Sequence, residues 1–159
     1  MGRKFTASET QLKPDPRYGD KVLARFINCI MQDGKKAVAQ RVVYNAFDVM
    51  KEKVEGDDVD PLEVFHQALD NVRPNVEVRS RRVGGTNYQV PMQVSRKRQQ
   101  SLAFRWIIQS ARSDRGRPMH LRLAKELMDA YNKEGKAMQT RDQTHRMAEA
   151  NKAFAHFAW

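Results

Sequence analysis

The side chains best suited to binding chemistry in this sequence are arginines, and they gather in one part of the chain. Residues 73–125 contain 13 Arg and Lys but only two acids, Glu77 and Asp114, which gives this block a net charge of +11. The rest of the chain carries 16 basic and 17 acidic residues, so the whole excess of the +10 total lies in the block. Only Lys97 and Lys125 of the block's cations are lysines. Because the planar fork of arginine suits phosphates and base edges, this concentration predicts a polyanionic partner, most often a nucleic acid.

The residues that usually carry catalysis or bind metal ions are few and poorly spaced for it. His66 and His120 fall in different predicted helices, and His145 and His156 lie about three helical turns apart, too far to share a metal ion. Cys29 is the one cysteine, which excludes an intramolecular disulfide and a cysteine-based zinc cluster. No stretch approaches the roughly 20 apolar residues that a membrane span requires. We therefore predict that the chain is not an enzyme, needs no cofactor or metal ion, and has neither a small-molecule substrate nor a membrane partner.

Apolar residues recur at helical spacing over most of the chain, and this pattern predicts six helices. They fall at residues 20–33, 36–56, 60–72, 95–111, 118–134 and 140–157. Asp20 and Asp60 can cap the first and third helices, and Thr140 opens a capping-box sequence before the last one. Val38 and Met147 lie on the apolar faces predicted for the second and last helices, so both are expected in the core.

Between the third and fourth helices the apolar spacing changes to a period of two, which predicts a β-hairpin over residues 73–94. Gly84 and Gly85 separate its two alternating runs and suit a tight turn at the tip. Pro74 and Pro91 are expected at its base, where they would end the strand pairing. Because a two-stranded ribbon is only marginally stable in water, the hairpin must pack on the helices or be held by a ligand.

Arginines follow both the hairpin and the helix after it. Arg79, Arg81 and Arg82 lie near the tip, where they repel one another unless a polyanion is bound, and Tyr88 lies behind them. The fourth helix has one polar lane along its length, which we call the arginine lane. It consists of Arg98, Ser101, Arg105, Gln109 and Arg112. The loop 113–118 adds further arginines directly after this lane.

Together these features predict a mainly α fold. We expect a single domain over residues 20–159, made of six helices with the hairpin protruding between the third and fourth, and an extended N-terminal arm over residues 1–19. A basic body with a ribbon is also typical of DNA-bending architectural proteins, which insert an apolar wedge into the minor groove. This tip has no proline wedge, and arginines backed by Tyr88 suit phosphates and stacked bases of structured RNA. RNA is therefore favoured, and a DNA-bending protein is the alternative.

Several long motifs are similar to those of a known family. They are KPDPRYGD (13–20), DGKKAVA (33–39), DPLEVFHQALDNVRPNVEVRSRRVGGTNYQVPMQV (60–94), RQQSLAFRWIIQSAR (98–112) and THRMAEANKAFAHF (144–157). On these motifs the sequence resembles the bacterial-type small-subunit ribosomal protein seven family over residues 13–159. Two features depart from the family pattern. Members usually open with a denser basic run than Arg3 and Lys4 provide, and they tend to end in Tyr-Arg-Trp where this chain has Phe157-Ala158-Trp159.

The resemblance implies a non-enzymatic structural protein of the small ribosomal subunit. Such a protein binds the 3′ major domain of the subunit's RNA directly, nucleates folding of the head, and lies at the subunit interface with its hairpin bordering the exit-site transfer RNA. The implied neighbours are small-subunit ribosomal proteins nine and eleven, and the implied location is cytoplasmic, with an organellar ribosome left open.

The resemblance and the arginine lane together give two sets of expected contact residues. Those expected to bind ribosomal RNA are Arg3, Lys4, Lys13, Lys35, Lys36, Arg79, Arg96, Lys97, Arg98, Arg105, Arg112, Arg115, Arg117, Met119 and Arg122. Those expected to face transfer RNA are Arg81, Arg82, Gly84, Gly85, Tyr88, His145 and Arg146.

Overall fold

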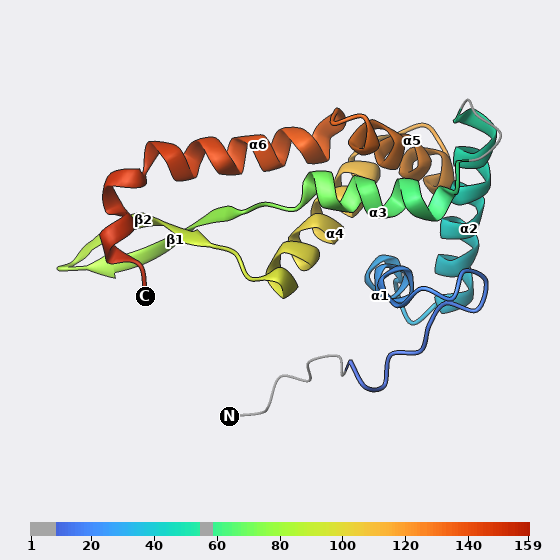
Figure 1. The fold of residues 1–159 in the computed structure, drawn as a ribbon, viewed down its shortest axis with the longest axis horizontal. Helices are drawn as coiled ribbons and strands as arrows, with labels where there is room; N and C mark the ends of the chain where they lie inside the picture. The colour runs from blue at the N-terminus through green and yellow to red at the C-terminus, as the bar shows by residue number, and fades with distance from the viewer. Residues whose placement is uncertain (1–8, 55–58) are drawn as a thin grey trace.

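The computed structural model describes residues 9–54 and 59–159, and within them the fold is mainly helical with one β-hairpin, as predicted (Figure 1). The elements in chain order are α1 (Lys21–Ile30), α2 (Lys36–Lys53), α3 (Pro61–Val72), β1 (Val76–Val83), β2 (Thr86–Gln93), α4 (Arg96–Ser113), α5 (Met119–Tyr131), α6 (Gly135–Ala150) and the short 3-10 helix η1 (Lys152–Phe157). The hairpin protrudes from the helical body between α3 and α4 (Figure 1). In the described part of the chain, no helix is both long and apolar enough to cross a membrane.

The core is built where the apolar faces of the first five helices meet. Phe26 of α1 packs edge to face against Phe65 of α3 and Phe104 of α4, with ring centroids 5.2 and 5.3 Å apart. The ring centroid of Phe47 in α2 lies 5.7 Å from that of Phe65. Helix α5 packs against α2, α3 and α4. This buried aromatic cluster fixes the helices whose ends carry the candidate site.

Local capping signals explain where α1 and α3 begin. The Asp20 carboxylate accepts a hydrogen bond from the Leu23 amide at 2.7 Å, and the Asp60 carboxylate accepts one from the Leu62 amide at 3.0 Å. The second Asp20 oxygen lies 2.7 Å from Nε2 of His66, which links the start of α1 to α3. Both predicted caps are therefore confirmed.

The predicted start of the last helix is wrong. Helix α6 begins at Gly135, and Thr140 lies inside it, where its hydroxyl donates to the Lys136 carbonyl at 3.0 Å. The cap comes instead from the neighbouring helix, because the buried Glu126 carboxylate of α5 accepts from the Ala137 amide at 2.9 Å. The helix also ends at Ala150, earlier than expected, and Met147 is 46% exposed rather than buried.

Pro91 does not end the hairpin ladder as expected, because it lies within β2 opposite Val78. Gly84 and Gly85 both have positive φ, 58° and 83°, as a two-residue type I′ turn requires. Counting from this turn, hydrogen-bonded and non-hydrogen-bonded pairs alternate, and the Val78–Pro91 pair falls in a non-hydrogen-bonded position. The missing N–H of Pro91 therefore faces outward from the ribbon and removes no ladder bond.

The segment just before α1 packs on α2 through a buried carboxylate. Asp15 is 3% exposed and accepts hydrogen bonds from the backbone amides of Arg17 and Tyr18 and from the Tyr44 hydroxyl, at 3.0, 2.9 and 2.5 Å. Burial and the Asp15 carboxylate raise the pKa of Tyr44 to about 12. Arg17 then lies over the Tyr44 ring and pairs with Asp48 at 2.7 Å.

Candidate nucleic-acid interface

A groove of about 390 Å³ opens where the end of α1, the start of α2, the end of α4 and the start of α5 meet. It is lined by Ile30, Gln32, Lys35, Val38, Ala39, Val42, Arg112, Met119 and Arg122. Four of these nine residues belong to the predicted RNA-binding set, namely Lys35, Arg112, Met119 and Arg122. Val38, expected in the core, is 48% exposed on the apolar wall of this groove. The fold thus brings together an apolar wall and three cations, which come from the turn before α2, from α4 and from α5.

The turn before α2 sets one edge of the groove. Asp33 and Gly34 both have positive φ, 54° and 71°, and this left-handed turn places Lys35 at the N-cap of α2. The Lys35 side chain makes no capping hydrogen bond, and Lys35 and Lys36 are both exposed. Because the backbone amides at a helix N-terminus carry partial positive charge, they add to the field of the two lysines.

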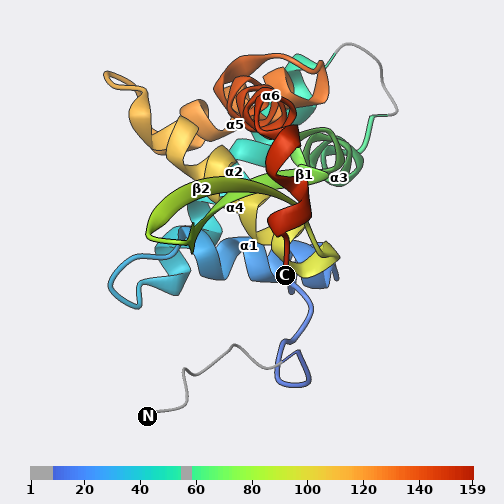
Figure 2. The same ribbon diagram turned by 90° about the vertical axis from the view of Figure 1, so that its left-hand side faces the viewer.

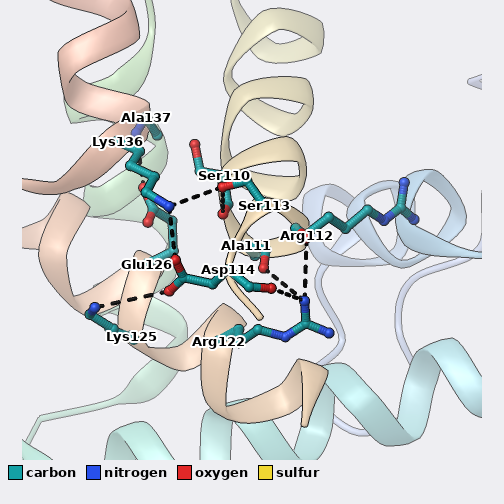
Figure 3. Close-up of polar contacts among 10 residues, drawn as sticks. All are labelled: Ser110, Ala111, Arg112, Ser113, Asp114, Arg122, Lys125, Glu126, Lys136 and Ala137. Carbon is teal, nitrogen blue, oxygen red and sulfur yellow. Dashed lines mark hydrogen bonds and ion pairs between the residues drawn. The ribbon is translucent and has the colours of Figure 1, made fainter. Parts of the chain in front are cut away.

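Two arginines at the other edge of the groove hold helix ends together. One Nη nitrogen of Arg122 lies 3.3 Å from the carbonyl oxygens of Ala111 and Arg112 and 2.6 Å from that of Asp114, so it caps the C-terminus of α4 (Figure 3). The Arg112 guanidinium donates to the carbonyl of Ile30, the last residue of α1, at 3.0 Å. Since these acceptors are neutral carbonyls, both arginines keep their full charge beside the groove.

The loop after α4 is anchored by its acid. Asp114 pairs with Lys136 at 2.8 Å and with Lys125 at 4.0 Å (Figure 3). The hydrogen bond from Lys136 and its charge lower the pKa of Asp114. Arg115 and Arg117 of this loop are exposed. In Figure 2 the loop and the turn before α2 project to the same side of the molecule.

The arginine lane of α4 faces solvent over most of its length. Ser101, Arg105, Gln109 and Arg112 are exposed, as predicted, and Arg98 is half-buried against Glu77 of β1. Arg96 and Lys97 at the start of α4 are exposed, and Lys97 pairs with Glu9 at 3.2 Å. Lys13 is also exposed, whereas Arg3 and Lys4 lie outside the described residues.

The hairpin arginines point in different directions. Paired residues of an antiparallel ribbon share a face, so Arg81 lies on the face of Tyr88 and Arg82 on the opposite face with Asn87. The Arg81 guanidinium donates to the Phe157 carbonyl, and its centre lies 5.0 Å from the centroid of the Trp159 ring. Arg82 and the tip glycines are exposed.

Tyr88 is covered by the C-terminal segment. Its ring centroid lies 5.1 Å from that of Phe154 and 5.1 Å from that of Phe157. This contact supplies the packing that the ribbon was expected to need, since η1 packs on β2 and α6 on β1. Arg81 and Tyr88 therefore contact protein groups, while the tip beyond them stays open.

His145 joins α6 to the base of the hairpin. Its Nε2 accepts a hydrogen bond from the Asn75 amide at 3.1 Å, so this nitrogen is unprotonated. Burial, and then the charge of Arg141, lower the pKa of His145. The next residue, Arg146, is exposed.

Comparison with known proteins decides the family. The family model described as Ribosomal protein S7p/S5e matches residues 2–152. A protein named small ribosomal subunit protein uS7 from Rhodopirellula baltica is 56% identical over 159 residues, covering 100% of both chains. Its namesake from Thermotoga neapolitana is 55% identical over 157 residues, covering 99% of each chain. The chain belongs to the ribosomal protein S7p/S5e family. The resemblance predicted from the sequence motifs is confirmed.

Membership of the S7p/S5e family settles two predictions made from the sequence. The family consists of structural ribosomal proteins, so the chain is not an enzyme. A ribosomal protein acts in translation as part of a ribonucleoprotein, which favours RNA over the DNA-bending alternative.

Sequence reasoning missed two groups of residues around the site of this S7p/S5e family member. Phe154 and Phe157 were predicted in a long last helix and Trp159 was given no contact, although all three pack on the hairpin. Glu77 was counted only as one of the two acids of the basic block, yet it pairs with two arginines. The density of aromatic residues after Ala150 was the one available signal, and nothing local marked Glu77.

Proposed function

We propose that this chain binds small-subunit ribosomal RNA directly, in its 3′ major domain, and nucleates folding of the head. Family membership makes it a structural component of the small ribosomal subunit. The proposal adds which RNA it binds and through which surface. The observation that carries it is the groove, where Lys35, Arg112 and Arg122 come together beside an exposed apolar wall.

The anchoring surface consists of the groove and the exposed part of the arginine lane. In this proposal the backbone phosphates of the RNA are contacted by Lys35 and Lys36, the first amides of α2, Arg105 and Arg112. Val38 and Met119 offer apolar surface on which an unpaired base can stack or insert. Four further predicted contacts extend this surface along α4 and the loop after it, namely Arg96, Lys97, Arg115 and Arg117.

The hairpin has a second role in this proposal. Its tip, with Arg82, Gly84 and Gly85, faces the exit-site transfer RNA at the subunit interface, and the exposed Arg146 lies on the same α6 that packs on β1. Small-subunit ribosomal proteins nine and eleven are its neighbours, and the protein resides in the ribosomes of the cytoplasm. Arg81 and Tyr88 stabilise the part of the hairpin next to the tip through their contacts with the C-terminal segment.

The salt dependence of binding tests the proposed RNA contact. If the protein neutralises about 6–10 phosphates, its affinity for a 3′ major domain RNA fragment falls about 10³- to 10⁵-fold between 50 and 200 mM salt. Arg105→Ala should lower the slope of log affinity against log salt by about 1. Gln109→Ala, one helical turn along the same exposed lane, is the matched control and should leave the slope unchanged. An affinity independent of salt would overturn the proposal.

A further inference from the structure

Glu77 is one of two acids in the basic block, and it forms ion pairs with two of the predicted RNA-binding arginines. Its carboxylate accepts a hydrogen bond from Nε of Arg79 at 3.0 Å, and Nη2 of the same guanidinium lies 2.9 Å from the same oxygen as an ion pair. It also accepts from both Nε and Nη2 of Arg98, at 3.3 and 3.2 Å, in a bidentate arrangement. Glu77 therefore joins Arg79 of β1 to Arg98 in the first turn of α4.

The burial of the three side chains shows which of them faces outward. The Glu77 side chain is 11% exposed, against 47% for Arg79 and 36% for Arg98. Nη1 of each guanidinium is not part of the pairing with Glu77, so each arginine can still donate to an outside acceptor. The result is two guanidinium groups held on one buried carboxylate, each belonging to a side chain that is partly exposed.

The start of α4 explains why a carboxylate is useful here. Its first turn carries Arg96, Lys97 and Arg98 and no acid, although cations are unfavourable at the positive end of the helix dipole. Ser95 makes no side-chain capping bond that would offset this. Glu77 of β1 supplies negative charge beside Arg98, and Glu9 pairs with Lys97, so these cations can stay at a helix end that also attracts phosphate.

We propose that Glu77 is a positioning residue for RNA recognition, which holds Arg79 and Arg98 as a rigid pair that contacts neighbouring phosphates of one RNA site. This inference rests on the proposed function. From net charge alone, a more basic protein should bind RNA more tightly, and the expected result here is the opposite. Removing the Glu77 charge makes the protein more basic, yet it weakens binding to the specific RNA, because two long side chains must then be ordered during binding.

The test compares Glu77→Gln with Glu52→Gln, which makes the same charge change at the exposed C-terminal end of α2. Affinity is measured for the 3′ major domain RNA fragment and for an unrelated RNA of the same length. Glu77→Gln should bind the specific fragment about 5- to 20-fold more weakly. The same variant should bind the unrelated RNA equally well or up to about twofold more tightly. Glu52→Gln should change neither affinity by more than about twofold.

Glu77→Asp is a second variant that serves as a control in case Glu77→Gln fails to fold. It keeps the charge, but its shorter side chain cannot reach both arginines, so the specific affinity should again fall while the unrelated RNA binds as before. Equal or tighter binding of the specific fragment by both Glu77 variants would overturn this inference and leave the proposed function intact. A wild-type protein that does not prefer the specific fragment would overturn the proposed function and the inference with it.

Discussion

The groove and the hairpin are both rich in arginine, but the arginines of the two regions donate to different kinds of acceptor. In the groove Arg112 and Arg122 donate to backbone carbonyls at the ends of α1 and α4. At the hairpin base Arg79 and Arg98 share the Glu77 carboxylate. A neutral carbonyl leaves the charge of an arginine intact, whereas a carboxylate cancels part of it and fixes its orientation. The groove is thus suited to strong electrostatic anchoring, and the hairpin base to oriented contact.

The two regions also differ in what supports them. The groove is formed by helices that meet in the buried core, next to Ile30 and Ala39. The ribbon has a covering layer made of the C-terminal segment, in which Phe157 contacts both Tyr88 and Arg81. Changes in the groove should therefore affect RNA affinity and global stability, and changes at the hairpin should affect local order.

The largest expected effect comes from removing the arginine that caps α4. Arg122→Met should lower the free energy of unfolding by about 2–3 kcal/mol, because carbonyls at the end of α4 lose a charged donor. Urea unfolding followed by circular dichroism measures this. The control, Arg117→Met, replaces an exposed arginine of the adjacent loop and should cost less than about 0.5 kcal/mol. Equal losses for the two variants would show that Arg122 does not stabilise the helix end.

The next largest effect is expected from two double variants, one in each region, that each remove two positive charges. Lys35→Ala with Lys36→Ala, at the groove, should weaken binding to naked 3′ major domain RNA by about 10- to 50-fold and lower the salt slope by about 2. Arg81→Ala with Arg82→Ala, at the hairpin, should weaken it by less than about threefold, although it should loosen transfer RNA at the exit site of assembled subunits. Equal losses on naked RNA would remove the distinction between the regions.

The contact between the C-terminal segment and the hairpin has a smaller and more local effect. Phe157→Ala removes an aromatic neighbour of Tyr88, an interaction worth about 1 kcal/mol. Amide hydrogen exchange in β1 and β2 should accelerate about fivefold, while α2 should exchange as in the wild type. Tyr131→Ala, which truncates a 39% exposed aromatic side chain at the end of α5, should leave the hairpin unchanged. Acceleration throughout the protein would mean that η1 supports the whole fold.

Local signals account for the part of this structure that the sequence predicts well. The helical and alternating apolar periods locate α1 to α5 and the hairpin, because those patterns reflect which face of each element is buried. Asp20 and Asp60 are recognisable as caps because each side chain bonds an amide two or three residues ahead. The arginine lane follows from the helical repeat alone.

Several features that were missed depend on residues far apart in the chain. Glu126 caps a helix that begins nine residues later, Glu77 bonds a residue 21 positions away, and Arg81 bonds one 76 positions away. Periodicity also cannot distinguish an apolar residue facing the core from one facing a groove, and Val38 is an example. These contacts exist only after the helices have packed, so no pattern within one segment encodes them.

The smallest effect concerns His145 and tests how α6 is attached to the hairpin base. The Asn75 amide can donate to Nε2 only while that nitrogen is unprotonated, and burial lowers the pKa of His145 below its ordinary value of 6.5. The unfolded chain therefore takes up the proton more readily, so the stabilisation is complete above pH 6.5 and is lost as the pH falls through the lowered pKa. The Asn75 amide resonance should shift between pH 7.5 and 5, with little change in global stability because the ring is partly exposed. His145→Gln keeps an acceptor that does not titrate, so it should abolish this shift, and a shift of the same size in the variant would assign the pH response to another group.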